Sequence, residues 1–253
     1  MSEVLLDARD VSRHFGGLKA VDGVSITLAR GELHAVIGTN GAGKSTLVNL
    51  LSGELPMTSG RVDLLGVDVS TWTQPRRARA GLGRSYQRNT IFPGFTVFEN
   101  CRLAAQARTP RVWDWWTPTS RCTDSRGGAE RAIARAGLVD VATRQAGTLS
   151  HGQKRQLEIA MCLATDPQVL LLDEPLAGMG AEETERMLAL LAELKAGHGV
   201  LLIEHDMDAV FRVADRITVM VNGRVIASDV PSAIRTNEAV QVAYLGDEFA
   251  EPA

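Results

Sequence analysis

Three glycines, a lysine and three hydroxyl side chains fall within the nine residues GTNGAGKST, which run from Gly38 to Thr46. The stretch matches the pattern G-x-x-x-x-G-K-[ST], whose fixed positions here are Gly38, Gly43, Lys44 and Ser45. Backbone N–H groups of such a loop can converge on phosphate oxygens, and the N-terminus of a following helix adds partial positive charge. Lys44 would reach the β and γ phosphates, and the Ser45 hydroxyl would bind Mg²⁺. The pattern predicts a nucleoside triphosphate site; the alternative is a glycine turn that matches by chance.

Two adjacent acids close the apolar stretch VLLLDEP at 169–175. If 169–173 is a strand of an α/β sheet, Asp173 and Glu174 lie at its carboxyl edge, where such proteins bind ligands. Asp173 would hold Mg²⁺ through water, and Glu174 would be the base that polarises the attacking water. The alternative is an acid pair that caps the next helix. A phosphate loop in the same chain favours the catalytic interpretation.

Two further motifs place polar groups at the ends of elements. In LSHGQKRQLEIA (149–160), Ser150 and Gly152 stand at the start of a predicted helix and offer a second anion site. One phosphate loop already holds one triphosphate, so a second site makes sense if it serves the nucleotide of another subunit. In LLIEHD (201–206), a strand ends in His205, which could contact a γ-phosphate. The alternatives are an ordinary capped helix and a structural histidine.

Short apolar runs predict the strands that position these groups. Such runs suit strands buried on both faces of a parallel sheet, and they occur at 33–38, 169–173, 200–204 and 217–221. Helical patterns lie between them, most clearly AEETERMLALLAELKAG (181–197). Strands that alternate with helices predict an α/β sheet. Alternating patterns at 4–12, 24–28 and 60–66 predict a second, antiparallel sheet beside it.

The stretch from 89 to 162 differs from both predicted sheets. It lacks clear β runs, contains the loop-like TPRVWDWWTPTSRCTDSRGG (109–128), and continues with the helix candidate AERAIARAGL (129–138). We therefore expect a helical subdomain at 89–162. It would be inserted into an α/β core made of 1–88 and 163–253.

Composition limits the classes of protein that this chain can belong to. Its 27 Lys plus Arg against 30 Asp plus Glu give no whole-molecule attraction to nucleic acid. Three cysteines without a CxxC pair argue against a disulfide framework or a zinc site. No apolar run approaches the roughly 20 residues of a membrane span, and the acids in MSEVLLDARD argue against a signal peptide. We expect a soluble chain whose membrane role depends on a partner.

Together the motifs resemble those of the ATPase subunit of ABC transporters, over nearly the whole chain to about Gly246. GTNGAGKST resembles the Walker A loop, LSHGQ the signature, VLLLDEP the Walker B strand, and His205 the switch histidine. The resemblance implies the α/β fold of a P-loop ATPase cassette: a RecA-like core, an antiparallel β subdomain and an inserted helical subdomain. It implies ATP and Mg²⁺ as cofactors. The residues that it assigns to ATP are Phe15, Gly38, Asn40, Gly41, Ala42, Gly43, Lys44, Ser45, Thr46, Ser150, Gly152 and Gln153.

Gln87 and Phe15 receive their roles from the resemblance alone. Gln87, in GLGRSYQRNTIFPGFTVFEN (81–100), resembles the Q-loop glutamine that joins the Mg²⁺ site to the helical subdomain. Phe15 takes the place of the aromatic side chain that stacks on adenine. The alternatives are a solvated loop amide and a small core aromatic. The resemblance thus assigns Mg²⁺ to Ser45, Gln87 and Asp173, and catalysis to Glu174, His205, Gln87 and Lys44.

Other segments narrow the resemblance to one subgroup of the family. RHFGGLKAVDGVS, IFPGFTVFEN, EPLAGMGAEET, IEHDMDAVFRVADRITVM and AYLG resemble ATPases of branched-chain amino acid importers and their urea- or amide-transporting relatives. The lipopolysaccharide-export ATPase shares several of these traits. Thr39 stands where proline is commoner, and His151 replaces a glycine or tyrosine of the signature. Neither departure removes a phosphate-contacting group, so we expect activity to survive.

The resemblance also implies partners. Two cassettes, identical or homologous, would meet head to tail and hold two ATP molecules between them. Their closure would act on integral membrane permease subunits at the cytoplasmic face of the inner membrane, with a solute-binding protein as an indirect partner and no nucleic acid. Trp113, Trp115 and Trp116 would either hold an irregular loop to its own helices or line the groove that receives the permease.

Two functions outside transport are the alternatives. A soluble ABC ATPase of DNA repair or translation usually has two cassettes in one chain or a long coiled-coil insert, and this sequence has neither. A regulator that binds nucleotide without hydrolysis is disfavoured because Lys44, Asp173, Glu174 and His205 are all present.

Overall fold

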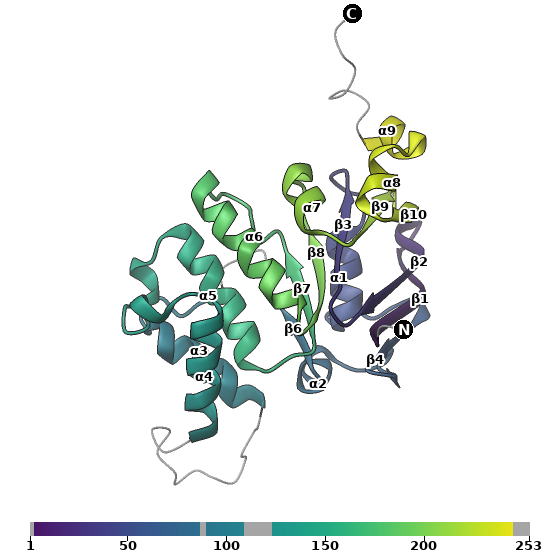
Figure 1. Cartoon of the computed structure of the whole chain (residues 1–253). Helices are drawn as coiled ribbons and strands as arrows, with labels where there is room; N and C mark the ends of the chain where they lie inside the picture. Colours follow the sequence, from purple (N-terminus) through teal and green to yellow (C-terminus); the bar gives the residue numbers. More distant parts are fainter. Residues whose placement is uncertain (1–2, 87–89, 109–122, 245–253) are drawn as a thin grey trace, which may run out of the picture.

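The computed structural model describes residues 3–86, 90–108 and 123–244. Figure 1 shows a central sheet with a group of helices on one side and a second sheet on the other. The predicted α/β class, with a second, antiparallel sheet and a helical segment, is confirmed. Within the described ranges, no helix combines the length and the apolar character that crossing a membrane requires.

The central sheet has the strand order β10-β9-β3-β8-β7-β6. Its strands are β3 (Leu33–Gly38), β6 (Leu82–Arg84), β7 (Val169–Asp173), β8 (Gly199–Ile203), β9 (Arg216–Val221) and β10 (Arg224–Asp229). Neighbouring strands run parallel, except that β10 is antiparallel to β9. Every residue of β3, β7 and β8 is buried, which explains their largely apolar sequences. Because these strands are parallel, their carboxyl ends share one edge of the sheet.

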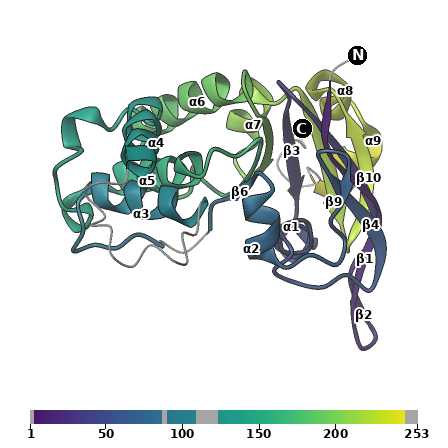
Figure 2. The ribbon, with the colours of Figure 1, turned by 90° about the horizontal axis from the view of Figure 1, so that it is seen from below.

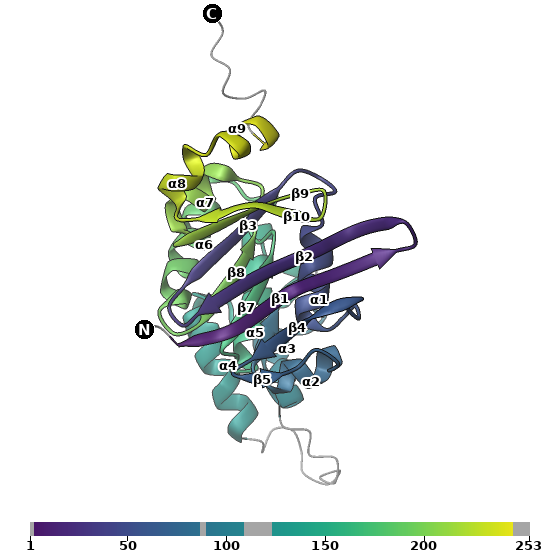
Figure 3. The ribbon, with the colours of Figure 1, turned by 90° about the vertical axis from the view of Figure 1, so that its right-hand side faces the viewer.

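Helix α1 (Lys44–Ser52) packs between the two sheets. The antiparallel sheet has the order β2-β1-β4-β5 and crosses in front of α1 in Figure 3. Its strands are β1 (Val4–Phe15), β2 (Leu18–Ala29), β4 (Ser59–Leu64) and β5 (Val67–Asp68). The apolar side chains of α1 pack with those of β1 on one side and with Val169 and Leu171 of β7 on the other. Helix α2 (Gln74–Arg79) follows the antiparallel sheet.

The opposite face of the central sheet is covered by α6 (Ala181–Lys195) and joins the core of the helical segment. Leu170 and Leu172 point to this face, opposite Val169 and Leu171. The helical segment comprises α3 (Val97–Arg108), α4 (Thr123–Arg135), α5 (His151–Ala164) and the 3₁₀ turns η2 (Val139–Val141) and η3 (Ala146–Thr148). Figure 2 shows these helices at one end of the molecule and the antiparallel sheet at the other. Helices α7 (Met207–Val213), α8 (Pro231–Arg235) and α9 (Glu238–Tyr244) pack near β9 and β10.

Some element boundaries differ from the predictions. The strand expected at 200–204 ends at Ile203, so Glu204 belongs to the turn that follows. The helix expected at 129–138 begins at Thr123, which makes part of the expected loop helical. A Cβ on Gly128 would lie only 3.3 Å from the Ala105 Cβ, so this glycine lets α4 approach α3 closely. Strand β6 was not predicted, because three residues are too short to show a pattern.

Candidate functional site

The phosphate loop joins β3 to α1 and is enclosed by backbone from two other strands. A Cβ on Gly38 (φ 156°) would lie 2.2 Å from the Met220 carbonyl oxygen. A Cβ on Gly43 (φ 99°) would lie 2.3 Å from the Ala20 carbonyl oxygen. No other residue fits at either position, because the clashing atoms are backbone. Gly38 and Gly43 are therefore required for the loop to pack against the backbone of β9 and β2.

The N-terminus of α1 faces the outer side of this loop. Gly43 precedes the helix and has no side chain that could cap the first N–H groups. Asn40, Gly41 and Ser45 are exposed, and Thr46 is partly buried. Ala42 is buried, and its carbonyl accepts the Gly223 N–H at 3.0 Å. The exposed N–H and hydroxyl groups make this end of α1 a suitable site for an anion.

Lys44 and Asp173 come together beneath the loop. The Lys44 ammonium is largely buried and donates to the Gly38 carbonyl at 2.6 Å and the Thr39 carbonyl at 3.1 Å. Burial lowers the pKa of Lys44, and the Glu174 and Asp173 carboxylates oppose this shift. Burial also raises the pKa of Asp173, an effect that the positive charges of Arg84 and Lys44 oppose. Lysine and carboxylates thus share one site at the sheet edge, as the motifs predict.

Glu174 occupies the first position after β7 in a strained conformation. Its φ of 49° lies in the left-handed region that L-residues seldom adopt. The Glu174 N–H donates to the Ile203 carbonyl at 2.9 Å, which ties this turn to the end of β8. His205 lies just beyond β8 with a largely exposed ring. The motif residues of β7 and β8 therefore stand on adjacent strand ends.

Glu204 joins these two turns, although it lies outside the motif residues predicted to act on ATP. One carboxylate oxygen accepts the Leu176 N–H at 2.8 Å, and the other accepts the His205 N–H at 3.2 Å. The side chain is completely buried, and burial raises the pKa of Glu204. An acid directly after four apolar strand residues was the signal in the sequence, but acids at strand ends are usually solvated.

Gln87 lies outside the described residues, whereas the segment that leads to it does not. Strand β6 pairs with β7, and the Ser85 hydroxyl accepts the Asp173 N–H at 3.2 Å. The Arg84 guanidinium binds Asn49 and Ser52 of α1, each at 2.6 Å, and lies over the Tyr86 ring. This segment is therefore attached both to the strand of Asp173 and to the helix of the phosphate loop.

The signature residues form the N-terminus of α5. The Ser150 hydroxyl accepts the Gln153 N–H at 3.2 Å, and the Gln153 side chain accepts the Ser150 N–H, which completes a capping box. The His151 ring contacts the Ala177 carbonyl at 3.1 Å, in the loop between β7 and α6. His151, which stands where the signature more often has glycine or tyrosine, thus connects the signature to the segment that follows Glu174.

Phe15 ends β1 at the tip of the β1–β2 hairpin. Its side chain is 46% exposed, so it is not a core aromatic. The Arg13 guanidinium lies 4.6 Å from the ring centroid. The same hairpin reaches the phosphate loop through Ala20, which approaches Gly43. Stacking of this exposed ring on a nucleotide base stays a prediction.

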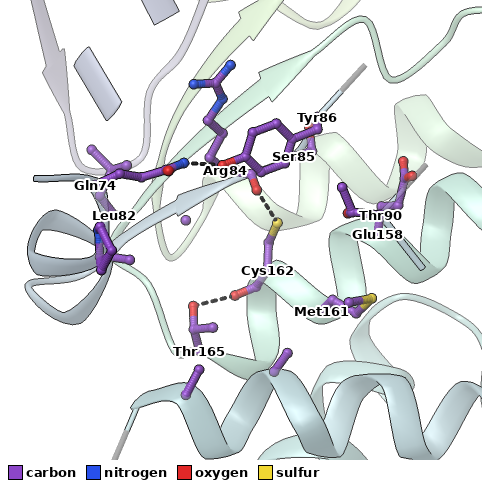
Figure 4. A pocket seen from close by; sticks show the side chains of 15 residues that line it. Gln74, Leu82, Arg84, Ser85, Tyr86, Thr90, Glu158, Met161, Cys162 and Thr165 are labelled. Carbon is purple, nitrogen blue, oxygen red and sulfur yellow. Dashed lines mark hydrogen bonds between the residues drawn. The ribbon is translucent and has the colours of Figure 1, made fainter. Parts of the chain in front are cut away.

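A pocket opens where the central sheet meets the helical segment (Figure 4). Side chains from α2, α3, α5 and the β6 segment line it, among them Leu82, Tyr86, Ala104, Met161 and Cys162. The Cys162 thiol donates to the Arg84 carbonyl at 3.0 Å, and burial raises the pKa of this thiol to about 12. Cys162 is therefore a packing residue rather than a nucleophile. Trp113, Trp115 and Trp116 lie outside the described residues.

The donor set suits a magnesium–triphosphate complex. The described residues contain no group of three or more His, Cys, Asp and Glu side chains that could hold a metal ion. Mg²⁺ does not need such a cage, because it commonly binds one or two carboxylates together with substrate phosphates and water. The Ser45 hydroxyl and the Asp173 carboxylate are oxygen donors of this kind, beside a lysine and an uncapped helix N-terminus.

Known proteins are similar to this chain in both sequence and fold. Residues 21–177 match the family described as ABC transporter, and residues 224–250 match the branched-chain amino acid ATP-binding cassette transporter family. The chain is 38% identical over 255 residues to the high-affinity branched-chain amino acid transport ATP-binding protein BraF of Pseudomonas aeruginosa, with 98% of this chain and 100% of the relative covered. It is 39% identical over 254 residues to LivG of Escherichia coli, a protein of the same description, with the same coverage. The ADP conformation of MJ1267, an ATP-binding cassette of an ABC transporter, superposes with a TM-score of 0.86 at 30% identity, and 97% and 100% of the two chains are covered.

Proposed function

This chain belongs to the ABC transporter family of ATP-binding proteins, and from that premise we propose that it drives an importer of branched-chain amino acids or related small polar solutes. Its enzymatic class is that of an ATPase coupled to transport. One observation carries the proposal of hydrolysis: Lys44, Asp173, Glu174 and His205 all lie at or just beyond the carboxyl ends of adjacent parallel strands.

These residues would have separate roles in ATP hydrolysis. The first N–H groups of α1 and the Lys44 ammonium bind the phosphates and offset their negative charge. Glu174 accepts a proton from the attacking water, and His205 contacts the γ-phosphate. Ser45, Gln87 and Asp173 would hold Mg²⁺, which neutralises charge on the β and γ phosphates. The backbone hydrogen bond from Glu174 to Ile203 holds this turn at the end of β8, on the carboxyl edge of the sheet.

The signature serves a second cassette. Ser150, Gly152 and Gln153 would bind the γ-phosphate held by the phosphate loop of an identical or homologous subunit, in a head-to-tail dimer. The second subunit is needed because one chain has one phosphate loop and one signature. Phe15 would stack on the adenine ring from its exposed position on the hairpin.

The pocket between the helical segment and the central sheet supports a permease as partner. It is lined largely by apolar side chains, and it lies directly beside the segment that leads to Gln87. A partner helix bound in this pocket would contact α3, α5 and the β6 segment together, so a movement of the two helices relative to β6 would displace it. With such a partner, the chain would be attached peripherally to the cytoplasmic face of the inner membrane, and a solute-binding protein would act through the permease.

The importer subgroup is favoured over lipopolysaccharide export. Both relatives named above match from end to end, and the C-terminal stretch matches a branched-chain amino acid transporter model separately.

Affinity purification of the tagged chain from native membranes tests the proposal. We expect integral permease subunits to co-purify in stoichiometric amounts, without nucleic acid. Reconstituted in vesicles, the complex should take up labelled leucine, isoleucine or valine only with ATP. A Lys44→Ala complex is the inactive control. Uptake of urea, without uptake of these amino acids, would assign a different substrate to the complex. A chain that purifies with nucleic acid and without membrane subunits would refute a function in transport.

A further inference from the structure

Glu183, in the first turn of α6, is bound to the start of α5. Its Oε1 atom accepts the Ser150 hydroxyl at 3.0 Å and the Gly152 N–H at 3.3 Å. A Cβ on Gly152 would lie 2.6 Å from the carboxyl carbon of Glu183. The glycine therefore allows an anionic group to lie directly against the helix start, and the carboxylate of Glu183 fills that place.

The Ser150 hydroxyl and the Gly152 N–H, which donate to Glu183, are also the donors with which the signature would bind a phosphate. A carboxylate and a phosphate both present anionic oxygens, and both are stabilised by hydrogen bonds from N–H and O–H groups at a helix N-terminus. Ser150 and Gly152 cannot donate the same hydrogens to both at once. Two anions held side by side also repel each other. The two ligands must exchange.

We propose that Glu183 is a further residue of the ATPase cycle, the internal ligand that the γ-phosphate of the second subunit's nucleotide replaces when the cassettes close. This inference rests on the function proposed above. The contact lowers the apparent affinity of the closed dimer for ATP, because only chains in which Glu183 has left Ser150 and Gly152 can complete the second site.

The surroundings of Glu183 separate it from its neighbour Glu182. The Glu182 carboxylate pairs with Arg186 at 3.0 Å, and its side chain is 88% exposed. Glu183 instead shares a pocket with Ser150, Gly152 and Gln153, and Arg186 lines the same pocket. Of these two consecutive glutamates, only Glu183 contacts the signature, whereas Glu182 pairs with Arg186 on the surface.

The test uses the complex that co-purifies with the full chain, and it measures ATP hydrolysis against ATP concentration. Glu183→Ala removes the competing carboxylate, so the ATP concentration for half-maximal hydrolysis should fall roughly three- to tenfold, as expected for losing two competing hydrogen bonds. Glu183→Gln keeps an acceptor without the charge and should fall between Glu183→Ala and the wild type. Glu182→Ala is the matched control and should not differ from the wild type.

The outcomes distinguish this inference from the proposed function. If the wild-type complex hydrolyses ATP and Glu183→Ala leaves the half-maximal concentration unchanged or raises it, the inference is wrong and the function stands. An increase would mean that the carboxylate supports the signature rather than competing for it. If the chain forms no complex with a permease, or the complex does not hydrolyse ATP, the function itself fails.

Discussion

At the scale of single residues, Glu174 is the one on which hydrolysis depends most directly. Its left-handed backbone conformation costs about 1–3 kcal/mol and is maintained by the bond to Ile203. Glu174→Gln keeps the shape and the hydrogen-bonding reach of the side chain but cannot accept the proton. We expect phosphate release to fall about 10²–10⁴-fold while ATP binding persists. Near-normal release from this variant would rule out Glu174 as the base.

Glu204 acts on two turns at once, so its substitution should affect turnover rather than binding. Glu204→Gln is nearly isosteric, but its amide nitrogen cannot accept the N–H that one carboxylate oxygen now accepts. Either the turn of Glu174 or that of His205 then loses its bond. We expect kcat to fall about 10-fold or more with KM for ATP within about twofold of wild type, corresponding to a lost interaction of about 1–2 kcal/mol.

Asp215→Asn provides the matched control for Glu204. The Asp215 carboxylate also accepts a backbone N–H, that of Leu33 at 2.9 Å, but Leu33 begins β3, at the sheet edge opposite the carboxyl ends of β7 and β8. A similar fall in kcat for both variants would show general destabilisation instead of a positioning role for Glu204.

At the scale of elements, α1 is held at its C-terminal end by a buried arginine of α2. Arg77 donates to the carbonyls of Leu50 and Leu51 at 2.9 and 2.7 Å, and burial lowers its pKa to about 10. A cation at this end also complements the helix dipole. Arg77→Met removes the side-chain donors to these carbonyls, of which Leu50 keeps only the Gly53 N–H at 3.2 Å. The change should reduce the free energy of unfolding by roughly 3 kcal/mol or more, measured by urea titration. Exposed Arg79→Met should change it by less than about 0.5 kcal/mol.

The sequence predicted elements well where burial imposes a pattern. β3, β7 and β8 are buried on both faces, and α6 shows helical spacing, so their residues carried clear signals. β6 could not be predicted because three residues show no period. The motifs located Lys44 and Asp173. The contacts of Glu204 and Glu183 remained hidden, because each depends on a neighbouring element that only folding brings close.

At the scale of the whole molecule, His34 of β3 connects the two sheets. Its Nδ1 lies 3.1 Å from the Thr27 carbonyl of β2, and its Nε2 lies 2.7 Å from the Thr218 hydroxyl of β9. The first contact requires Nδ1 to donate, so Nε2 accepts in the neutral ring. Burial lowers the pKa of His34 to about 4. The folded protein therefore favours the uncharged form.

This burial makes stability depend on pH. Between the ordinary histidine pKa and about 4, the unfolded chain binds the proton more readily, so the free energy of unfolding falls as pH falls. This contribution to the free energy of unfolding, relative to its value at low pH, is fully present above about pH 6.5 and amounts to roughly 3 kcal/mol. His34→Gln cannot titrate, so the stability difference between wild type and variant should shrink by up to this amount from pH 7.5 to pH 4, measured by denaturant titration. A constant difference would contradict the assignment.

The enclosure of the phosphate loop has a consequence for the thermodynamics of ligand capture. Because backbone from β2 and β9 presses against Gly38 and Gly43, the loop loses its conformational entropy when the chain folds and not when a ligand arrives. Binding then orders little of the protein at this site, and more of the interaction energy remains as affinity. The side of the site formed by α5 is different, since there a carboxylate must first depart. The phosphate loop is thus ready to bind before nucleotide arrives, whereas the signature at the start of α5 must first release Glu183. We therefore expect nucleotide to bind first at the phosphate loop.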